Sequence, residues 1–178
     1  MSRTTFAVAP ATASDLGAIS RIYDHYVESS AATFDLEPKT MAWRREWFST
    51  FGEQGRYRLL VARGGDGVLG YASSLPHRPK AAYEPTVETT VYVAPGHTGQ
   101  RVGLALYRSL LAELETEDVH RTCAGITLPN PASVRLHERC GFRHVGTFTE
   151  QGRQFGRYWD VAWYERPFPP DPRPRSTA

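Results

Sequence analysis

The sequence predicts an α/β domain in which a mixed central sheet of about seven strands is packed by about four helices. Runs of β-branched and aromatic residues alternate with segments whose apolar residues recur every three or four positions, and Gly and Pro separate these segments. A chain of 178 residues has the length of one domain and can bury a core. We expect a single domain over residues 1–166 and a flexible, proline-rich tail over residues 167–178.

The first half of the chain predicts four strands and two helices. Apolar residues recur at helical spacing from Leu16 onward, behind Thr12 and Ser14, either of which can cap a helix N-terminus. Pro38 suits the first position of a second helix, which we expect to end before the glycine at 52. The expected strands span residues 6–9, 57–62, 68–75 and 86–93, and the first helix spans residues 16–28.

The second half predicts two further helices and three strands. Leu106, Leu110 and Leu114 follow a four-residue step after Val102, which predicts an amphipathic helix from that residue. Gly141 suits the position just after the end of a later helix. We expect that helix over residues 131–140 and strands over residues 122–128, 142–148 and 158–164.

The junction of the strand 86–93 with the following helix is the most informative stretch. A β-branched run stops at Pro95-Gly96, a short Gly-rich turn follows, and the helical pattern then begins. The free N–H groups of a first helical turn, together with the positive end of the macrodipole, form an anion site. Gly103 and Ala105 leave room for a phosphate, although a small Gly-x-Ala turn can also serve packing alone. Gly-Lys-Ser/Thr and G-x-G-x-x-G are both absent, which argues against a P-loop and a dinucleotide fold.

Glu88 lies on the strand that enters this turn. Alternation places Glu88, Thr90 and Tyr92 on one face and a Val/Thr-rich set on the other, provided that no bulge near Val91 shifts the parity. A strand glutamate can be merely solvated. Its position ahead of an anion loop favours a general base, because a carboxylate can take the proton of an incoming amine.

The segment from Asn130 to Phe142 carries a second group of candidates. Ser133 and His137 are four residues apart and therefore share one face of the expected helix. His137 could be a half-buried histidine satisfied by a neighbour, a general acid, or a partner of Glu88, and these alternatives stay open.

Two cations and a phenol, Arg78, Lys80 and Tyr83, lie in the loop directly before Glu88. Arginine suits bidentate capture of a carboxylate or phosphinate, and lysine adds a point charge. The alternative is a solvated basic loop. Phe34, between the first two helices, could be an apolar wall of a pocket or ordinary core.

Composition excludes several classes of protein. The net charge of +2, from 21 basic and 19 acidic residues, is too balanced to indicate a nucleic-acid partner. In addition, no run of Lys and Arg in the sequence forms a basic stripe. We expect no signal peptide and no membrane-spanning segment. Cys123 and Cys140 have no metal or redox spacing and read as reduced thiols of a cytoplasmic protein. We expect no metal, and neither cysteine has a base at a spacing that indicates an acyl-enzyme.

The motif Gln100-x-x-Gly103-x-Ala105 and the later segment 130–142 resemble the signatures of the GNAT acetyltransferases. Further blocks at residues 25–30 with Phe34, 83–93, 128–138 and 155–161 resemble the phosphinothricin acetyltransferases among them, over about residues 5–166. The resemblance implies the GNAT fold, acetyl-CoA as donor, and acetylation of the α-amino group of phosphinothricin, methionine sulfoximine or methionine sulfone. It also implies a homodimer.

Roles for individual residues follow from that resemblance. Glu88 is the expected base, and His137, or else Tyr107, returns a proton to the departing thiolate. The residues expected to hold acetyl-CoA are Val91, Tyr92, Val93, Gly99, Gln100, Arg101, Val102, Gly103, Leu104, Ala105, Asn130 and Ser133. The residues expected to shape the amino-acid pocket are Phe34, Arg78, Lys80, Tyr83 and Thr90, together with His137.

Departures from the family pattern leave the acceptor open. Gln154 replaces a usual Lys, Tyr158 replaces a usual Trp, and Arg101 replaces a frequent Gly. One alternative is a GNAT that acetylates a polyamine, an aminoglycoside or a protein N-terminus, although Arg78 and Lys80 suit an anionic acceptor better than a cationic one. The other is a non-catalytic sensor that binds acetyl-CoA.

Overall fold

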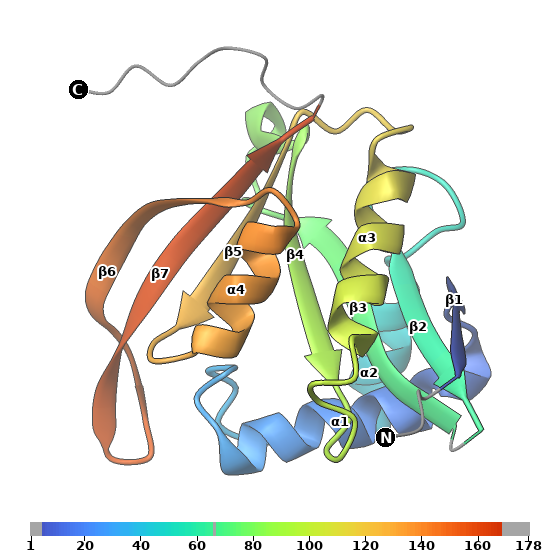
Figure 1. The fold of residues 1–178 in the computed structure, drawn as a ribbon, viewed down its shortest axis with the longest axis horizontal. Coiled ribbons are helices and arrows are strands. Elements are labelled where there is room, and N and C mark those ends of the chain that lie inside the picture. The colour runs from blue at the N-terminus through green and yellow to red at the C-terminus, as the bar shows by residue number, and fades with distance from the viewer. Residues whose placement is uncertain (1–4, 66, 169–178) are drawn as a thin grey trace.

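The computed structural model describes residues 5–65 and 67–168, and its centre is one seven-stranded sheet. The strand order is β1-β2-β3-β4-β5-β7-β6, with β4 and β5 parallel and every other neighbouring pair antiparallel (Figure 1). The strands are β1 (Phe6–Pro10), β2 (Leu59–Gly64), β3 (Gly67–Pro76), β4 (Thr86–Val93), β5 (Arg121–Thr127), β6 (Arg143–Gln154) and β7 (Arg157–Pro167). The mixed sheet expected from the sequence is confirmed.

Four α-helices and two 3-10 turns accompany the sheet. The helices are α1 (Leu16–Ser29), α2 (Met41–Phe48), α3 (Val102–Leu114) and α4 (Pro131–Arg139), and the turns are η1 (Ala13–Asp15) and η2 (Ala81–Tyr83). Leu106, Leu110 and Leu114 of α3 are fully buried in the larger core cluster, as their four-residue spacing predicts. Ile19 and Ile22 of α1 pack with Val61 and Tyr71 of the sheet in a second cluster. The sheet is therefore covered by α1 and α2 on one face and by α3 and α4 on the other (Figure 1).

The alternation predicted along β4 is confirmed. Its pairing with β3 runs in unbroken register from Gly70–Val93 to Pro76–Val87, so no bulge shifts the parity. Val91 and Val93 pack on the core that contains α3, whereas Tyr92 packs in the cluster that contains α1. Glu88 and Thr90 therefore share the α1 side of β4 with Tyr92.

The parallel pairing of β4 with β5 is short. It comprises Thr86–Arg121, Val87–Thr122 and Glu88–Cys123. Beyond Glu88 the two strands are no longer paired, and a cavity opens between them. The loop 94–101 that leads to α3 lies at the same end of β4.

Several predicted boundaries are wrong. The second helix begins at Met41 rather than Pro38, because Thr40 caps it by accepting a hydrogen bond from the Trp43 N–H at 3.2 Å. The last two strands are longer than predicted and form an extended hairpin.

The expected tail starts too early. Pro167 still belongs to β7, and Phe168 is buried with its N–H donating to the His120 carbonyl at 2.8 Å. The rest of the predicted tail, residues 169–178, lies outside the described residues. Within the part of the chain that the structure describes, no helix is both long and apolar enough to cross a bilayer.

Candidate functional site

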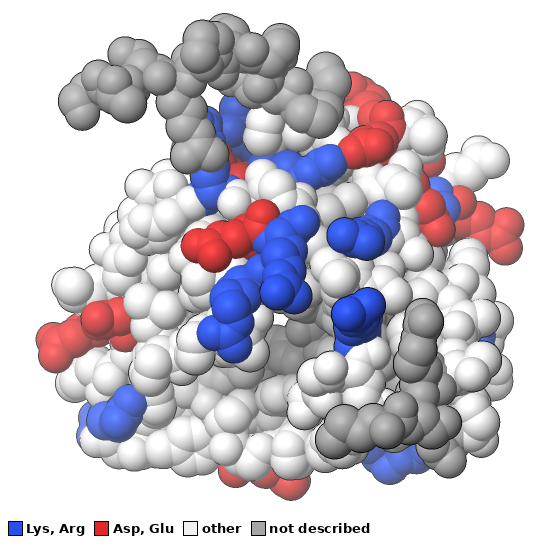
Figure 2. Space-filling view, viewed as in Figure 1, with Lys and Arg blue, Asp and Glu red and all other residues white. Residues whose placement is uncertain are grey.

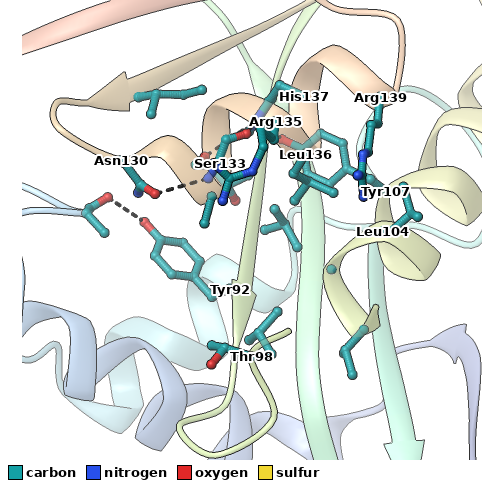
Figure 3. Close-up of a pocket in the computed structure, with 18 of the residues that line it drawn as sticks. Tyr92, Thr98, Leu104, Tyr107, Asn130, Ser133, Arg135, Leu136, His137 and Arg139 are labelled. Carbon is teal, nitrogen blue, oxygen red and sulfur yellow. Dashed lines mark hydrogen bonds between the residues drawn. The ribbon is translucent and has the colours of Figure 1, made fainter. Parts of the chain in front are cut away.

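A cavity of about 470 Å³ lies in the gap between β4 and β5. Its walls come from β4, the loop before α3, the start of α3, the end of β5, and α4 (Figure 3). The sequence-predicted residues that line it are Thr90, Val91, Tyr92, Val93, Gly99, Arg101, Val102, Gly103, Leu104, Tyr107, Asn130, Ser133 and His137. Gln100, Ala105, Glu88, Phe34, Arg78, Lys80 and Tyr83 are not among the lining residues.

The predicted anion loop has the backbone of a tight turn. Gly96, Gly99 and Arg101 all adopt positive φ, at 84°, 76° and 65°, and α3 begins directly after Arg101. The Gln100 side chain donates to the Gly96 carbonyl at 2.8 Å and so braces the turn rather than lining the cavity. The first residues of α3 border the cavity, where their N–H groups can bind an anion.

Gly103 serves packing as well as the cavity. A Cβ at this position would lie 3.3 Å from Leu136 Cδ2 and 3.4 Å from Val93 Cγ2. Glycine therefore allows α3 to approach both β4 and α4 closely. The packing interpretation of Gly103 is therefore confirmed. Gly103 also lines the cavity, and the approach of a phosphate to it stays a prediction.

Basic side chains surround the mouth of the cavity. Arg101 lies at the start of α3, and Arg135 and Arg139 project from α4 (Figure 3). Figure 2 shows Lys and Arg side chains gathered around a hollow on this face. Sequence reasoning gave Arg135 and Arg139 no role, although their four-residue spacing on one helix could have drawn attention to them.

Asn130 and Ser133 sit at the start of α4. The Asn130 side chain accepts a hydrogen bond from the Ser133 N–H at 3.1 Å and thus caps the helix. Both residues also line the cavity.

His137 is buried and bonded through both ring nitrogens. Nδ1 lies 2.8 Å from the Ser133 carbonyl, and Nε2 lies 2.8 Å from the Tyr107 hydroxyl. A carbonyl only accepts, so we assign the ring proton to Nδ1. Burial lowers the pKa of His137 and keeps it neutral, so Nε2 accepts a hydrogen bond from the Tyr107 hydroxyl.

This arrangement excludes one of the three interpretations of His137. His137 and Tyr107 lie on the α3 side of the sheet, whereas Glu88 points to the α1 side. The suggested partnership of His137 with Glu88 is therefore not formed. The Tyr107 hydroxyl also lies 3.2 Å from the Thr89 carbonyl, and burial raises the pKa of Tyr107 above its usual range.

The partner of Glu88 is a histidine to which sequence reasoning gave no role. His77 Nδ1 lies 3.6 Å from Glu88 Oε2, and its ring meets Trp163 and Tyr83 edge-on, with centroids 5.8 and 6.2 Å away. Burial is the main influence on the carboxyl and raises the pKa of Glu88, while His77 and Arg78 lower it in part. A raised pKa suits a carboxylate that must accept a proton near neutral pH.

The remaining acceptor-side candidates lie on β4, in the β3–β4 loop and in the α1–α2 loop. Arg78 and Lys80 are exposed, and Tyr83 is 46% exposed. The Thr90 hydroxyl lies 3.0 Å from that of Ser73. Phe34 packs over Gly152 of β6, where a Cβ would lie only 2.2 Å from the ring. Phe34 is thus an anchor between the α1–α2 loop and the β6–β7 hairpin, and the structure does not place it against Glu88.

No group of three or more His, Cys, Asp or Glu side chains suited to a metal occurs among residues 5–65 and 67–168. Both cysteines are free thiols, and burial raises the pKa of Cys123 to about 11 and that of Cys140 in the same direction.

Comparison with known proteins gives consistent results. The Acetyltransferase (GNAT) family matches residues 19–142. The chain is 55% identical to a phosphinothricin N-acetyltransferase of Streptomyces coelicolor, over 90% of this chain and 95% of that one. It is 36% identical to an L-methionine sulfoximine/L-methionine sulfone acetyltransferase of Pseudomonas aeruginosa, covering 85% and 88% of the two chains.

A solved structure from Sinorhizobium meliloti, a phosphinothricin acetyltransferase in complex with acetyl-CoA, superposes with a TM-score of 0.88 at 30% identity. The match covers 98% of this chain and 95% of that chain.

The substitution His77→Gln tests the environment of Glu88. We expect it to raise the pKa of the Glu88 carboxyl further, because it removes a group that lowers that pKa. Carbon NMR of glutamate-labelled protein across a pH series measures this shift. His25→Gln, on the exposed surface of α1, is the control and should leave the titration of Glu88 unchanged. An unchanged titration in His77→Gln contradicts the assignment.

Proposed function

Because the chain belongs to the Acetyltransferase (GNAT) family, we propose that it moves the acetyl group of acetyl-CoA to the α-amino group of a small amino acid or analogue. The expected acceptors are of the phosphinothricin, methionine sulfoximine and methionine sulfone type, which the names of its relatives carry. The observation that carries the proposal is one cavity that joins the start of α3, the unpaired part of β4 and the Tyr107–His137 pair.

The donor half of the site lies on the α3 side. The first turn of α3 would bind the pyrophosphate through its N–H groups, with Arg101, Arg135 and Arg139 as countercharges at the mouth. The pantetheine arm would then run along Val91 to Val93, and a strand N–H there would stabilise the oxyanion of the tetrahedral intermediate.

The acceptor half would lie on the α1 side of β4, around Glu88. The Glu88 carboxylate would take a proton from the ammonium group of the acceptor, directly or through water, and so produce the neutral amine. That amine attacks the thioester carbonyl and the new C–N bond forms. The nitrogen then loses its second proton to solvent as the C–S bond breaks and CoA thiolate leaves. Arg78 and Lys80 would hold the anionic end of the acceptor, with Tyr83 and Thr90 beside them.

The proton that the thiolate needs would come from Tyr107 rather than from His137. At their contact the proton belongs to the tyrosine hydroxyl, because neutral His137 carries its proton on Nδ1, toward Ser133. The raised pKa of Tyr107 keeps that hydroxyl protonated through the neutral range. His137 would hold the hydroxyl in place.

A panel of acceptors tests the proposal together with Glu88→Gln. We expect wild-type protein to release CoA with methionine sulfone, methionine sulfoximine or phosphinothricin, and Glu88→Gln to lower kcat by about 10²–10⁴-fold by removing the base. A thiol-reactive dye measures CoA release, and calorimetry should give the same Kd for acetyl-CoA in both proteins. Glu84→Gln, an exposed carboxylate before β4, is the matched control.

Other outcomes of that panel would overturn the proposal. Activity on spermidine, an aminoglycoside or a peptide N-terminus alone would assign a different acceptor. Tight acetyl-CoA binding without CoA release over the whole panel would make the protein a sensor. Unchanged turnover in Glu88→Gln would remove Glu88 from the mechanism while leaving the acceptor assignment intact.

Tyr107→Phe tests the proton source for the thiolate. We expect kcat to fall by about 10²-fold, because a general acid is lost while the ring still fills its place in the core. Tyr164→Phe is the control, since that ring also packs near His137, with centroids 6.3 Å apart. Steady-state kinetics at saturating acetyl-CoA measure the effect, and equal kcat in the two variants would return the role to His137.

We infer a homodimer in which the β6–β7 hairpin contributes to the interface. β6 is an edge strand of the sheet, and the hairpin exposes Val145, Phe148, Phe155 and Tyr158, each by more than half. An exposed edge with apolar side chains is suited to pairing with a second copy.

Light scattering should give twice the 20.0 kDa of one chain, and Phe148→Arg should shift the mass toward that of the monomer. Leu36→Arg, at a residue 73% exposed in the α1–α2 loop, is the control and should stay dimeric. A monomeric wild-type protein would contradict the inference.

We also place the protein in the cytoplasm, where its two free cysteines stay reduced, and infer that its reaction needs no metal. Cell fractionation checks the location. Turnover should be unchanged after dialysis against EDTA.

A further inference from the structure

The hydrogen-bonding groups of β4 alternate between its two edges. The Ala94 N–H, directly after the strand, donates to the Leu69 carbonyl of β3 at 2.8 Å. Even-numbered residues of β4 therefore direct their N–H and C=O groups toward β3, and odd-numbered residues direct theirs toward β5. Since pairing with β5 ends at Glu88, the groups of Val91 and Val93 face the cavity.

Tyrosine hydroxyls lie at two carbonyls along this edge. Tyr26, from α1, donates to the Val93 carbonyl at 2.7 Å. Tyr107, from α3, lies 3.2 Å from the Thr89 carbonyl, in addition to its shorter bond with His137. The two side chains reach the same strand edge from opposite faces of the sheet. Between them lie the N–H of Val91, the C=O of Val91 and the N–H of Val93.

These three groups form a donor, acceptor and donor set. A pantetheine thioester carries carbonyl oxygens that accept and amide N–H groups that donate, so such an arm can pair along this stretch. The next group along the strand, the Val93 carbonyl, is a second acceptor and would repel the carbonyl oxygens of the ligand. Without a partner it would also lose its hydrogen bond to water when the ligand enters the cavity. The Tyr26 hydroxyl donates a hydrogen bond to that carbonyl and so satisfies it.

We propose that Tyr26 is a positioning residue for the acyl donor. By occupying the Val93 carbonyl, it determines which backbone groups of β4 pair with the pantetheine arm, and thereby where the thioester carbonyl lies against the strand. The inference rests on the proposed binding of acetyl-CoA, but not on Glu88 or on the identity of the acceptor.

The surroundings of Tyr26 hold its hydroxyl in this position. Its ring packs against Tyr92, with centroids 5.1 Å apart, and against His25 at 5.4 Å. Tyr26 itself lines the cavity. Burial raises the pKa of Tyr26, so the hydroxyl keeps the proton that it donates.

Tyr26→Phe tests the proposal because it removes the hydroxyl and leaves the ring. We expect the Kd for acetyl-CoA to rise about fivefold or more, because the Val93 carbonyl loses its partner in a cavity that the ligand closes to water. The Kd for 3′-phospho-ADP, which lacks the pantetheine arm and engages only the α3 half, should stay unchanged. Calorimetry measures both ligands on the full chain.

Tyr23→Phe is the matched control. It removes a phenol hydroxyl one turn earlier on α1, where the partners are Thr33 at 2.6 Å and Asp35 at 2.9 Å rather than β4. Thermal unfolding of both variants separates binding from stability, and we expect Tyr23→Phe to leave both Kd values unchanged.

The proposal is overturned by an unchanged acetyl-CoA Kd in Tyr26→Phe, or by equal weakening of acetyl-CoA and 3′-phospho-ADP, which indicates a general disturbance of the fold. If the wild-type protein binds acetyl-CoA but acetylates no amine of the panel, the proposed function fails, while a selective loss of acetyl-CoA affinity in Tyr26→Phe still supports the role of Tyr26.

Discussion

The early end of the pairing between β4 and β5 is the constraint on which the rest of the site depends. Three residue pairs join the strands, and after Glu88–Cys123 they separate. Backbone N–H and C=O groups that a longer ladder would have used internally then face a cavity. The proposed cofactor half would need this opening, because a pantetheine arm can pair with a strand only where no neighbouring strand already does. The last paired residue of β4 is also the candidate base, so the opening begins where the acid–base chemistry is proposed.

The two faces of β4 separate the proposed roles. Glu88 points toward α1 and has His77 and Arg78 around it, whereas Tyr107 and His137 lie toward α3. Deprotonation of the amine and protonation of the thiolate are thus assigned to opposite sides of one strand, and the acetyl group would pass through the gap between β4 and β5. Burial acts on both sides but in opposite directions, since it raises the pKa of Glu88 and lowers that of His137. The lower pKa leaves His137 neutral, as it must be to accept from Tyr107, and the higher pKa makes the Glu88 carboxylate a stronger proton acceptor.

Local patterns predicted most of this arrangement. The alternation of residues 87–93 was enough to assign the two faces of β4. The four-residue spacing from Leu106 to Leu114 was enough to assign the buried face of α3. Each assignment depends only on the period of a regular element. Contacts between distant segments could not be predicted in this way. The approach of His77 to Glu88 depends on how the β3–β4 loop folds back, and the separation of His137 from Glu88 depends on which face of the sheet α4 covers. Phe34 packs on Gly152 from 118 residues away in the sequence, which no local pattern encodes.

The helix layers do more than cover the sheet, because each supplies a hydroxyl to the open edge of β4. An unpaired strand edge normally presents donors and acceptors in alternation, and a ligand could then pair with it in more than one register. Tyr26 engages one carbonyl from the α1 layer, and Tyr107 approaches another from the α3 layer. If the ligand shifted by two residues along β4, a carbonyl oxygen of the ligand would face the Val93 carbonyl. That carbonyl is itself an acceptor and already bonds to Tyr26, so the shifted position is disfavoured. Because the one hydroxyl proton of Tyr107 goes to His137, the contact of Tyr26 with the Val93 carbonyl would determine the register of the thioester. The position of the reacting carbon relative to Glu88 would follow from that register.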